Sequence, residues 1–236
     1  MTGSARIEFL PWDTEFWGVR AARLHANSVD DLAGADSVIA EDKIRWVSLL
    51  APSTDVALIN AAVRLGYSIV DVRITLFKYL GDCAASSHAD LAALDDTDQM
   101  AAIAATAFPL SRFSVDPHLD DRRCELFYDT WVRNSMNGQM ADAVVVSRND
   151  RQVDGFVTMR LRPDRTASLP LVAIRSDRRG RGVGNRLVTG ALSWLAAQGA
   201  MNVDVVTQLS NLSAVRLYES VGFQAVDAGH WLHRWY

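Results

Sequence analysis

One segment limits the folds open to this chain more than any other, because it predicts a buried strand, a glycine-rich loop and a helix in direct succession. The unpaired amide groups and the positive dipole end of such a helix favour anions. Glycines in the loop let a phosphate group approach the backbone, since no Cβ stands in the way. The segment reads Leu171-Val172-Ala173-Ile174-Arg175-Ser176-Asp177-Arg178-Arg179-Gly180-Arg181-Gly182-Val183-Gly184. It predicts an anion-binding loop in an α/β fold.

This loop differs from two common phosphate-binding motifs. Gly180, Gly182 and Gly184 are spaced two and two, unlike the G-x-G-x-x-G dinucleotide fingerprint, and no Lys-Ser/Thr pair follows, as a Walker motif requires. The structural alternative is a glycine-rich turn with solvated arginines. Behind the loop, a helix over residues 182–198 is expected to pack an apolar face against the sheet, with Leu187, Val188, Ala191, Leu192 and Leu195.

A second signal lies in residues 207–219, where a strand ends in polar residues and a helix begins. Asn211 is placed either to cap that helix or to donate to a ligand. Tyr218 follows two turns later on nearly the same face, so its side chain can point back towards the end of the strand. The alternative for Tyr218 is a core aromatic residue with a satisfied hydroxyl.

The hydrophobic pattern predicts alternating strands and helices along the chain. Strands are expected over residues 6–12, 19–25, 46–51, 68–79, 141–147, 153–161, 168–174 and 203–207, with a turn at 13–15 and a final strand pair from 223. Helices are expected over residues 30–43, 98–108, 120–136, 182–198 and 212–220, with a further helix capped by residues 53–55 and ended by Gly66. The Ala- and Ser-rich segment 81–90 lacks an apolar period, which predicts a domain boundary and two domains, 1–85 and 86–236.

Two helix ends resemble one another. Residues 63–67 and 220–223 both place a glycine at the end of a helix and an aromatic residue at the start of a strand. Any helix-to-strand connection can use this pair, so a common origin and a coincidence both remain open. A common origin would make the first 80 residues a truncated relative of the second part.

Composition excludes several function classes. Hydrophobic residues make up 49% and charged residues 22%, with a net charge of −4 and a pI of about 5.7, so no uniformly basic surface exists for nucleic acid or a membrane. Cys83 and Cys124 are far apart and lack ligand spacing, which predicts neither a disulfide nor a metal site. No signal peptide or bilayer-length apolar stretch is expected. We therefore expect a soluble, cytoplasmic protein without a metal.

The two signals together resemble the GNAT superfamily of acyl-CoA-dependent N-acyltransferases. Its pyrophosphate motif, R/Q-x-x-G-x-G/A, is met by Arg179, Gly182 and Gly184, and its later Asn, helix Tyr and closing Gly-Phe correspond to Asn211, Tyr218 and Gly222-Phe223. The resemblance covers residues 98–236. It implies a mixed central sheet flanked by helices, with acetyl-CoA as the acyl donor.

A more detailed similarity covers nearly the whole chain. The segment 10–19, LPWDTEFWGV, looks like the opening of the TDP-fucosamine acetyltransferases, and residues 111–113, 127–132, 155–158, 207–218 and 231–234 extend the similarity. That family joins a partial GNAT-like N-terminal domain to a complete catalytic one. The resemblance implies acetylation of the 4-amino group of dTDP-4-amino-4,6-dideoxy-D-galactose, a step in surface polysaccharide biosynthesis.

The resemblance also implies roles for individual residues. Tyr218 is the expected general acid for the leaving thiolate, and backbone amides of residues 172–174 are expected to hold the thioester oxygen. The expected contacts of acetyl-CoA are Val172, Ala173, Ile174, Arg179, Gly180, Arg181, Gly182, Val183, Gly184 and Asn211. The amine needs no strong base, because an amino sugar is partly neutral near pH 7 and water can take its proton.

Contacts to the nucleotide sugar are expected from the segment 111–131. Arg112, Arg122 or Arg123 would bind the diphosphate, and Phe113, Tyr128 or Trp131 would stack on thymine or the sugar. Asp116 and His118 lie in the same segment and are candidates for the amine or its proton path. For each of these residues the alternative is surface charge or core packing.

Other readings stay open at this point. One alternative is a catalytically silent acyl-CoA-binding module, although the presence of Tyr218 argues against it. Another is an enzyme that acylates a different amine, such as another amino sugar, an aminoglycoside or a peptide, or that uses a longer acyl-CoA. The partners expected are small molecules, with no nucleic acid and no membrane, and a homodimer is compatible with this fold.

Overall fold

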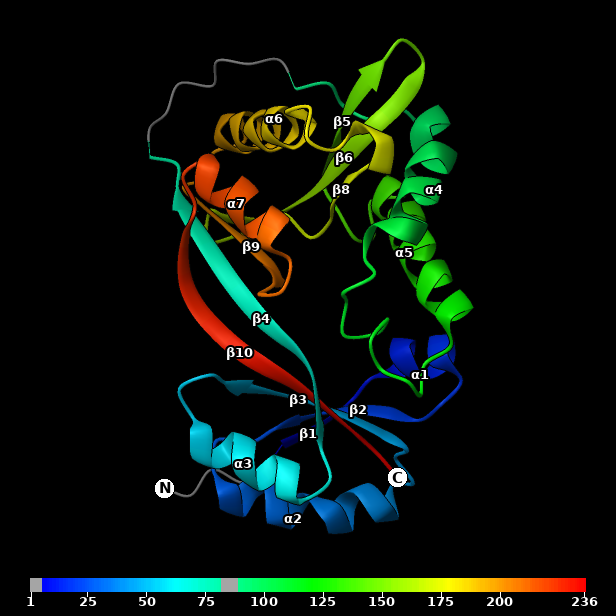
Figure 1. The fold of residues 1–236 in the computed structure, drawn as a ribbon, viewed down its shortest axis with the longest axis vertical. Helices are drawn as coiled ribbons and strands as arrows, with labels where there is room; N and C mark the ends of the chain where they lie inside the picture. Colours follow the sequence, from blue (N-terminus) through cyan, green and yellow to red (C-terminus); the bar gives the residue numbers. More distant parts are fainter. Residues whose placement is uncertain (1–5, 82–88) are drawn as a thin grey trace.

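A ten-stranded mixed sheet runs through the part of the chain that the structure describes, and helices cover both of its faces (Figure 1). The strand order is β1-β2-β3-β10-β4-β9-β7-β6-β5, with β8 paired to β6. The computed structural model describes residues 6–81 and 89–236. The α/β fold class expected from the sequence is confirmed.

The first described segment contains β1 (Arg6–Phe9), α1 (Pro11–Trp17), β2 (Ala21–His25), α2 (Val29–Glu41), β3 (Trp46–Pro52), α3 (Val56–Arg64) and β4 (Ser68–Tyr79). The second contains η1 (Leu94–Asp96), α4 (Thr97–Ala107), α5 (Asp121–Met136), β5 (Ala143–Asn149), β6 (Gln152–Leu161), β7 (Thr166–Ser168), β8 (Val172–Ile174), η2 (Ser176–Arg178), α6 (Val183–Ala197), β9 (Asn202–Gln208), α7 (Leu212–Ser220) and β10 (Gln224–Trp235). Most predicted strands and helices are confirmed within two or three residues.

Strand alternation explains how one sheet serves two cores. On β5, Val144 and Val146 pack with α4 and α5, whereas Val145 packs on the opposite face with α6. Phe156 and Val157 of β6 divide in the same way. Successive side chains of a strand point to opposite faces, so a continuous apolar run is what a strand between two helical layers requires. A third core lies between α2, α3 and the strands β2 and β3.

The C-terminal strand joins the two parts of the chain. The sequence predicted a strand pair from residue 223, but the structure has one long strand, β10, with two irregularities in its register. β10 lies between β3 and β4 and is antiparallel to both. Figure 1 shows β4 and β10 running from the upper to the lower part of the molecule. The predicted boundary at 85/86 lies outside the described residues, and the division into two domains stays a prediction.

The prediction of a turn at residues 13–15 is wrong, because these residues lie inside α1. Pro11 occupies the first turn of the helix, where its missing N–H costs nothing, and Asp13 favours the positive end of the helix dipole. Trp12, predicted in a strand, belongs to the same helix. α1 also places its aromatic residues against those of α5, since Trp12 and Phe16 both pack on Phe127.

The prediction of one strand over residues 168–174 is also wrong, because the structure divides it into β7 and β8. Three residues, 169–171, oppose two on β6, which makes a β-bulge. Pro170 has no N–H for a ladder. The hydroxyl of the buried Thr158 accepts a hydrogen bond from the Leu171 amide at 2.9 Å and so stabilises the break.

The two helix ends that resemble one another in sequence, those of α3 and α7, also have the same backbone geometry. Gly66 and Gly222 have φ angles of +90° and +88°, which a residue with a Cβ rarely adopts. The next residue donates in each case to the carbonyl five positions back, Tyr67 to Ala62 and Phe223 to Tyr218, both at 3.0 Å.

The helices of residues 6–81 and 89–236 include none long and apolar enough to cross a membrane.

Candidate active site

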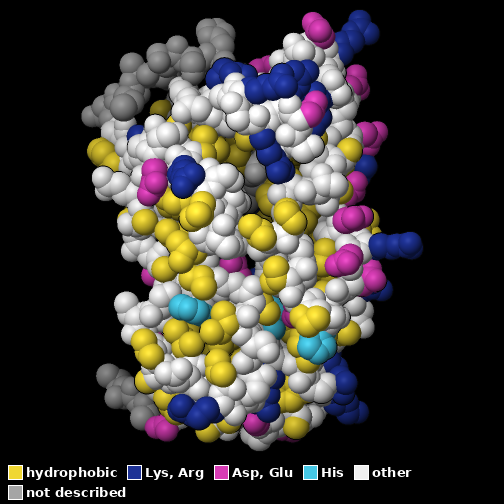
Figure 2. All heavy atoms as spheres, viewed as in Figure 1, with side chains coloured by type: hydrophobic (Ala, Val, Ile, Leu, Met, Phe, Trp, Pro, Cys, Tyr) yellow, Lys and Arg dark blue, Asp and Glu magenta, His cyan; other side chains and the backbone are white. Residues whose placement is uncertain are grey.

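A cavity of about 560 Å³ opens where two neighbouring strands separate. β7 pairs with β9 as far as Ser168 and Asp204, whereas β8 pairs with β6 among the described strands. The gap between β8 and β9 is lined by residues 169–172 and 206–208, and α7 closes one side. Figure 2 shows hydrophobic side chains surrounding a hollow on this face.

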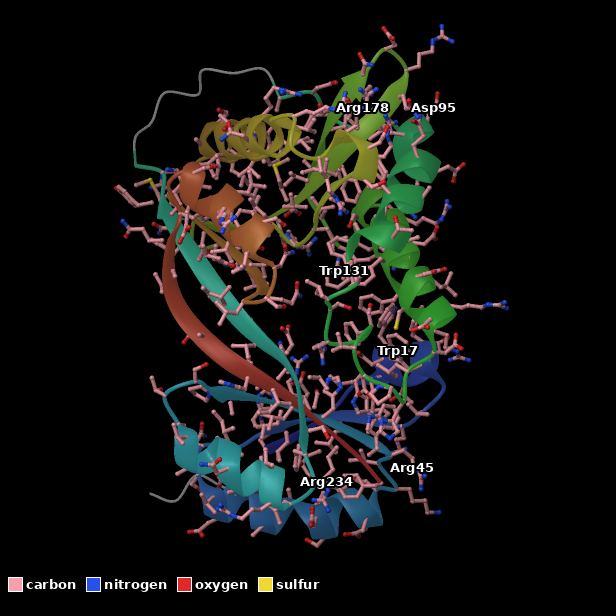
Figure 3. All side chains as sticks on the ribbon, in the orientation of Figure 1. Trp17, Arg45, Asp95, Trp131, Arg178 and Arg234 are labelled. Carbon is pink, nitrogen blue, oxygen red and sulfur yellow. The ribbon has the colours of Figure 1, made fainter. Side chains whose placement is uncertain are left out.

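The loop that follows β8 is held by a buried carboxylate. Asp154 of β6 forms ion pairs with Arg175 at 3.2 Å and with Arg178 at 3.1 Å. Arg175 also pairs with Asp177 at 2.7 Å. Figure 3 shows Arg178 at the upper end of the molecule, beside this loop. Arg175 and Arg178 therefore fix the first part of the loop, whereas Arg179 and Arg181, further along the loop, are exposed.

The backbone of the loop offers unused hydrogen-bond donors. No described group accepts a hydrogen bond from the amides of Gly180, Arg181, Gly182 or Val183, which lead into α6. Gly180 and Gly182 have φ angles of +73° and +74°, a conformation that favours glycine. Together with the positive end of the α6 dipole, these amides are suited to bind an anion.

Gly184 has a different role. A Cβ at this position would lie 2.9 Å from Ile174 Cδ1 and 2.9 Å from Leu217 Cδ2. Its lack of a side chain therefore lets α6 pack closely against β8 and α7. The loop and the helix thus use glycine for two physical reasons, backbone conformation and close packing.

Tyr218 of α7 lines the cavity, and 4% of its surface is exposed. No described residue forms a hydrogen bond with its hydroxyl, so the proton on that oxygen has no protein acceptor. Burial raises the pKa of Tyr218 above its ordinary value of 10. The phenol is therefore neutral near pH 7 and can donate a proton to a ligand in the cavity.

Asn211 caps the N-terminus of α7, which is one of the two roles predicted for it. Its side-chain oxygen accepts from the Ala214 amide at 3.3 Å and from the Ser213 hydroxyl at 2.8 Å. Asn211 also lines the cavity. Of the three β8 residues predicted to contact the thioester, Val172 lines the cavity and Ala173 packs into the core beside α4.

Four of the predicted acceptor residues line the cavity, namely Arg112, Phe113, Tyr128 and Trp131. Tyr128 is stacked on Phe108 at 4.3 Å, and burial raises the pKa of Tyr128 to about 12. Figure 3 shows Trp131 on the inner side of α5, and its indole Nε1 is buried with no hydrogen-bond partner among the described residues.

The other predicted acceptor residues lie elsewhere. Asp116 is buried outside the cavity lining, and His118 has 58% of its side chain exposed. Arg122 is exposed on α5, whereas Arg123 donates to the Phe16 carbonyl at 2.8 Å and so joins α5 to α1.

Asp116 instead fixes Arg112 through a histidine. His233 Nδ1 lies 2.6 Å from Asp116 Oδ2, and Arg112 Nη1 lies 3.1 Å from His233 Nε2. Because a guanidinium only donates, Nε2 must accept and the ring proton sits on Nδ1. Burial and the adjacent Arg112 cation lower the pKa of His233 to about 4, since a second proton would meet that cation. The chain Asp116–His233–Arg112 is thus a neutral-histidine relay between a buried carboxylate and a cavity arginine.

Charged residues from the first part of the chain complete the cavity, and sequence reasoning missed them. Arg23 of β2, Asp13 of α1, and Asp71 and Arg73 of β4 all line it. A signal for two of them existed, because the charged residues Asp71 and Arg73 share one face of β4 in a mainly apolar stretch. Arg23 offered no such signal.

Burial perturbs both cavity carboxyl groups. It raises the pKa of Asp13, and it raises the pKa of Asp71 to about 6, although Arg112 opposes both shifts. Asp71 therefore exchanges a proton close to neutral pH. Within residues 6–81 and 89–236, no group of three or more His, Cys, Asp or Glu side chains is arranged to hold a metal ion.

Comparison with known proteins places this geometry in context. Residues 98–223 match the acetyltransferase (GNAT) family. The dTDP-fucosamine acetyltransferase of Escherichia coli O6:H1 is 27% identical over 231 residues, 98% of each chain. The spore coat polysaccharide biosynthesis protein SpsD of Bacillus subtilis is 31% identical over 140 residues, 59% of this chain and 48% of that protein.

The fold is shared with solved structures at lower identity. A GCN5-related N-acetyltransferase from Sphaerobacter thermophilus superposes with a TM-score of 0.67 at 14% identity, over 98% of this chain and 76% of that one. This likeness concerns the arrangement of the elements alone.

Proposed function

The chain belongs to the GNAT family of acetyltransferases, and we propose that it transfers an acetyl group from acetyl-CoA to the 4-amino group of a dTDP-linked amino-dideoxy sugar. The acceptor would resemble dTDP-4-amino-4,6-dideoxy-D-galactose, and the product would serve surface glycan biosynthesis. The observation that carries the proposal is a single cavity lined by Tyr218 and by charged residues of both parts of the chain. Similarity over nearly the full length to a dTDP-fucosamine acetyltransferase supports the choice of acceptor.

The donor would bind at the start of α6. The free amides of residues 180–183 suit the pyrophosphate of acetyl-CoA, and the exposed Arg179 and Arg181 add positive charge. The gap between β8 and β9 would then receive the pantetheine arm, because neither strand edge has a partner there among the described strands. This places the thioester on the side of the cavity that Tyr218 lines.

The reaction forms a bond between the amine nitrogen and the thioester carbon and breaks the carbon–sulfur bond. Tyr218 would give its proton to the departing sulfur, whose conjugate acid has a pKa of about 8.5 by analogy with cysteine. Water would take the proton that the amine loses. Asp71, which lies beside Arg73 and Arg112 and has a pKa of about 6, is the cavity carboxylate that would receive this proton through water. Neither role requires a metal.

An acceptor screen tests the proposal. The protein is incubated with acetyl-CoA and, separately, with dTDP-4-amino, dTDP-3-amino and UDP-amino sugars, and products are identified by mass. We expect one added acetyl group on the dTDP-4-amino sugar and slower transfer to the other two. Longer acyl-CoAs define the donor in parallel. Transfer to a simple amine but to none of the nucleotide sugars would refute the proposed acceptor.

A further inference from the structure

We infer that Arg23, Arg73 and Arg112 form a subsite that binds the diphosphate group of the acceptor. This arginine subsite is separate from the anion site at α6, and the inference rests on the proposed function for the identity of its ligand. The three side chains come from β2, from β4 and from the loop before α5, and all of them line the cavity.

The subsite contains arginines without carboxylate partners. None of the three arginines has a carboxylate of the described residues within 4.0 Å, although Asp13 and Asp71 line the same cavity. The Nε atoms of Arg23 and Arg73 are buried and have no hydrogen-bond partner among those residues. A buried donor without a partner costs free energy, so a bound water, ion or ligand is expected to accept from it. The oxygens of a diphosphate are suited to accept from several such donors at once.

Arg112 is fixed in place before any ligand arrives. His233 accepts from its Nη1, and its guanidinium carbon lies 4.3 Å from the Trp231 ring centroid and 4.2 Å from that of Phe113. Arg23 approaches the same Trp231 ring at 5.4 Å. The indole thus lies near both guanidinium groups. Preset donors lose little conformational entropy on binding, which favours affinity for a diphosphate.

The arginines of the subsite repel one another in the absence of a ligand. Burial, reinforced by the neighbouring Arg23 cation, lowers the pKa of Arg112 to about 10. Burial also lowers the pKa of Arg73. Both remain protonated at neutral pH. Asp13 and Asp71 line the cavity, and Asp227 and Asp204 also face Arg73. A diphosphate would give the three guanidinium groups acceptors and relieve the repulsion between them.

The placement fits the shape of a nucleotide sugar. Figure 1 places α7, which carries Tyr218, in the upper part of the molecule and β2, which carries Arg23, in the lower part. In a 4-amino nucleotide sugar the amine and the diphosphate lie on opposite sides of the pyranose ring. A diphosphate held by the arginines therefore directs the amine towards Tyr218 and the gap between β8 and β9.

Calorimetric titration with dTDP and with inorganic pyrophosphate tests the inference without any turnover. Arg23→Gln, Arg73→Gln and Arg112→Gln are each expected to weaken dTDP binding at least about tenfold, because each removes a charge-assisted hydrogen bond. Arg122→Gln is the matched control, since Arg122 is exposed and lies outside the cavity lining. Binding of coenzyme A to the same variants checks that each one folds. Lysine variants, which keep the charge, are used where a glutamine variant does not fold.

Each outcome separates this inference from the proposed function. Weaker dTDP binding in the three variants, with coenzyme A binding intact, supports the subsite even if the acceptor screen finds no dTDP sugar. Unchanged dTDP binding in all three variants overturns the subsite, even if a dTDP-4-amino sugar is acetylated. No dTDP binding to the unaltered protein also overturns it. Pyrophosphate binding that follows the same variants assigns the affinity to the diphosphate and not to the thymidine.

Discussion

Replacing Tyr218 with phenylalanine should reduce turnover while leaving the fold intact. The ring packs against Phe223 at 5.8 Å and remains in Tyr218→Phe, so the apolar contacts of α7 are kept. No described residue forms a hydrogen bond with the hydroxyl, so its removal leaves no protein group unpaired. We therefore expect the free energy of unfolding to change by less than about 0.5 kcal/mol, as for a substitution that breaks no contact.

The expected loss in kcat follows from the loss of the general acid. A positioned proton donor typically contributes about 10² to 10⁴ in rate, which corresponds to about 3 to 5 kcal/mol in the activation barrier. Affinity for acetyl-CoA should stay near the unaltered value, because the hydroxyl acts on the leaving sulfur and not on the nucleotide. The loss therefore appears in kcat and in kcat/KM, while the donor Kd is unchanged.

The assay is a steady-state measurement of free thiol release, with donor affinity from calorimetry and stability from urea unfolding. Tyr67→Phe is the control for kcat, because Tyr67 is equally buried, with 4% exposed, but packs in the core beside α2 and α3, where its hydroxyl bonds to Tyr236. The kcat of the Tyr67→Phe variant should stay near that of the unaltered protein. A Tyr218→Phe enzyme with full turnover would remove this residue from the mechanism.

Three further predictions concern the loop, the cavity acid and the histidine relay. Gly182→Leu should weaken coenzyme A binding in calorimetry, whereas Gly199→Leu, which is strained alike at φ +84° but lies past the other end of α6, should not. The pH profile of kcat/KM should rise through an apparent pKa of about 6 as Asp71 ionises, and Asp71→Asn should abolish that limb; an unchanged limb would assign it to another group. His233 has a pKa of about 4 in the folded protein, below its ordinary 6.5, so the unfolded chain takes up the proton first as the pH falls. The free energy of unfolding therefore decreases between about pH 6.5 and pH 4, by about 3 kcal/mol at most. His233→Gln should show a smaller loss in urea unfolding between pH 7 and pH 5, and an equal loss would contradict the neutral-histidine assignment.

Local patterns allowed much of the fold to be predicted. β4 and α7 have the expected bounds, since each is a periodic segment closed by clear end signals. The helix α1 was missed because Asp-Thr-Glu also suits a turn, and the start signal at Pro11 decides between the two. The break between β7 and β8 depends on a bulge that forms only against β6, so residues 168–174 alone look like one strand.

The candidate site was predictable only where it is built from adjacent residues. The loop before α6 and Tyr218 of α7 each lie in one short motif that the sequence shows, and their roles stay predictions. The arginine subsite brings together residues 23, 73 and 112, which no spacing rule connects. The relay likewise joins Asp116 to His233, which are 117 positions apart. Pairing of β10 with β3 and β4 creates these contacts, and strand order is a property of the whole chain.

A crystal structure of the protein with coenzyme A and dTDP bound together tests the account most directly. We predict that the coenzyme A pyrophosphate meets the amides of residues 180–183, that its sulfur lies within hydrogen-bond reach of the Tyr218 hydroxyl, and that the dTDP diphosphate contacts the arginine subsite. A complex with coenzyme A away from this loop, or with its sulfur remote from Tyr218, would contradict the assignment of the active site.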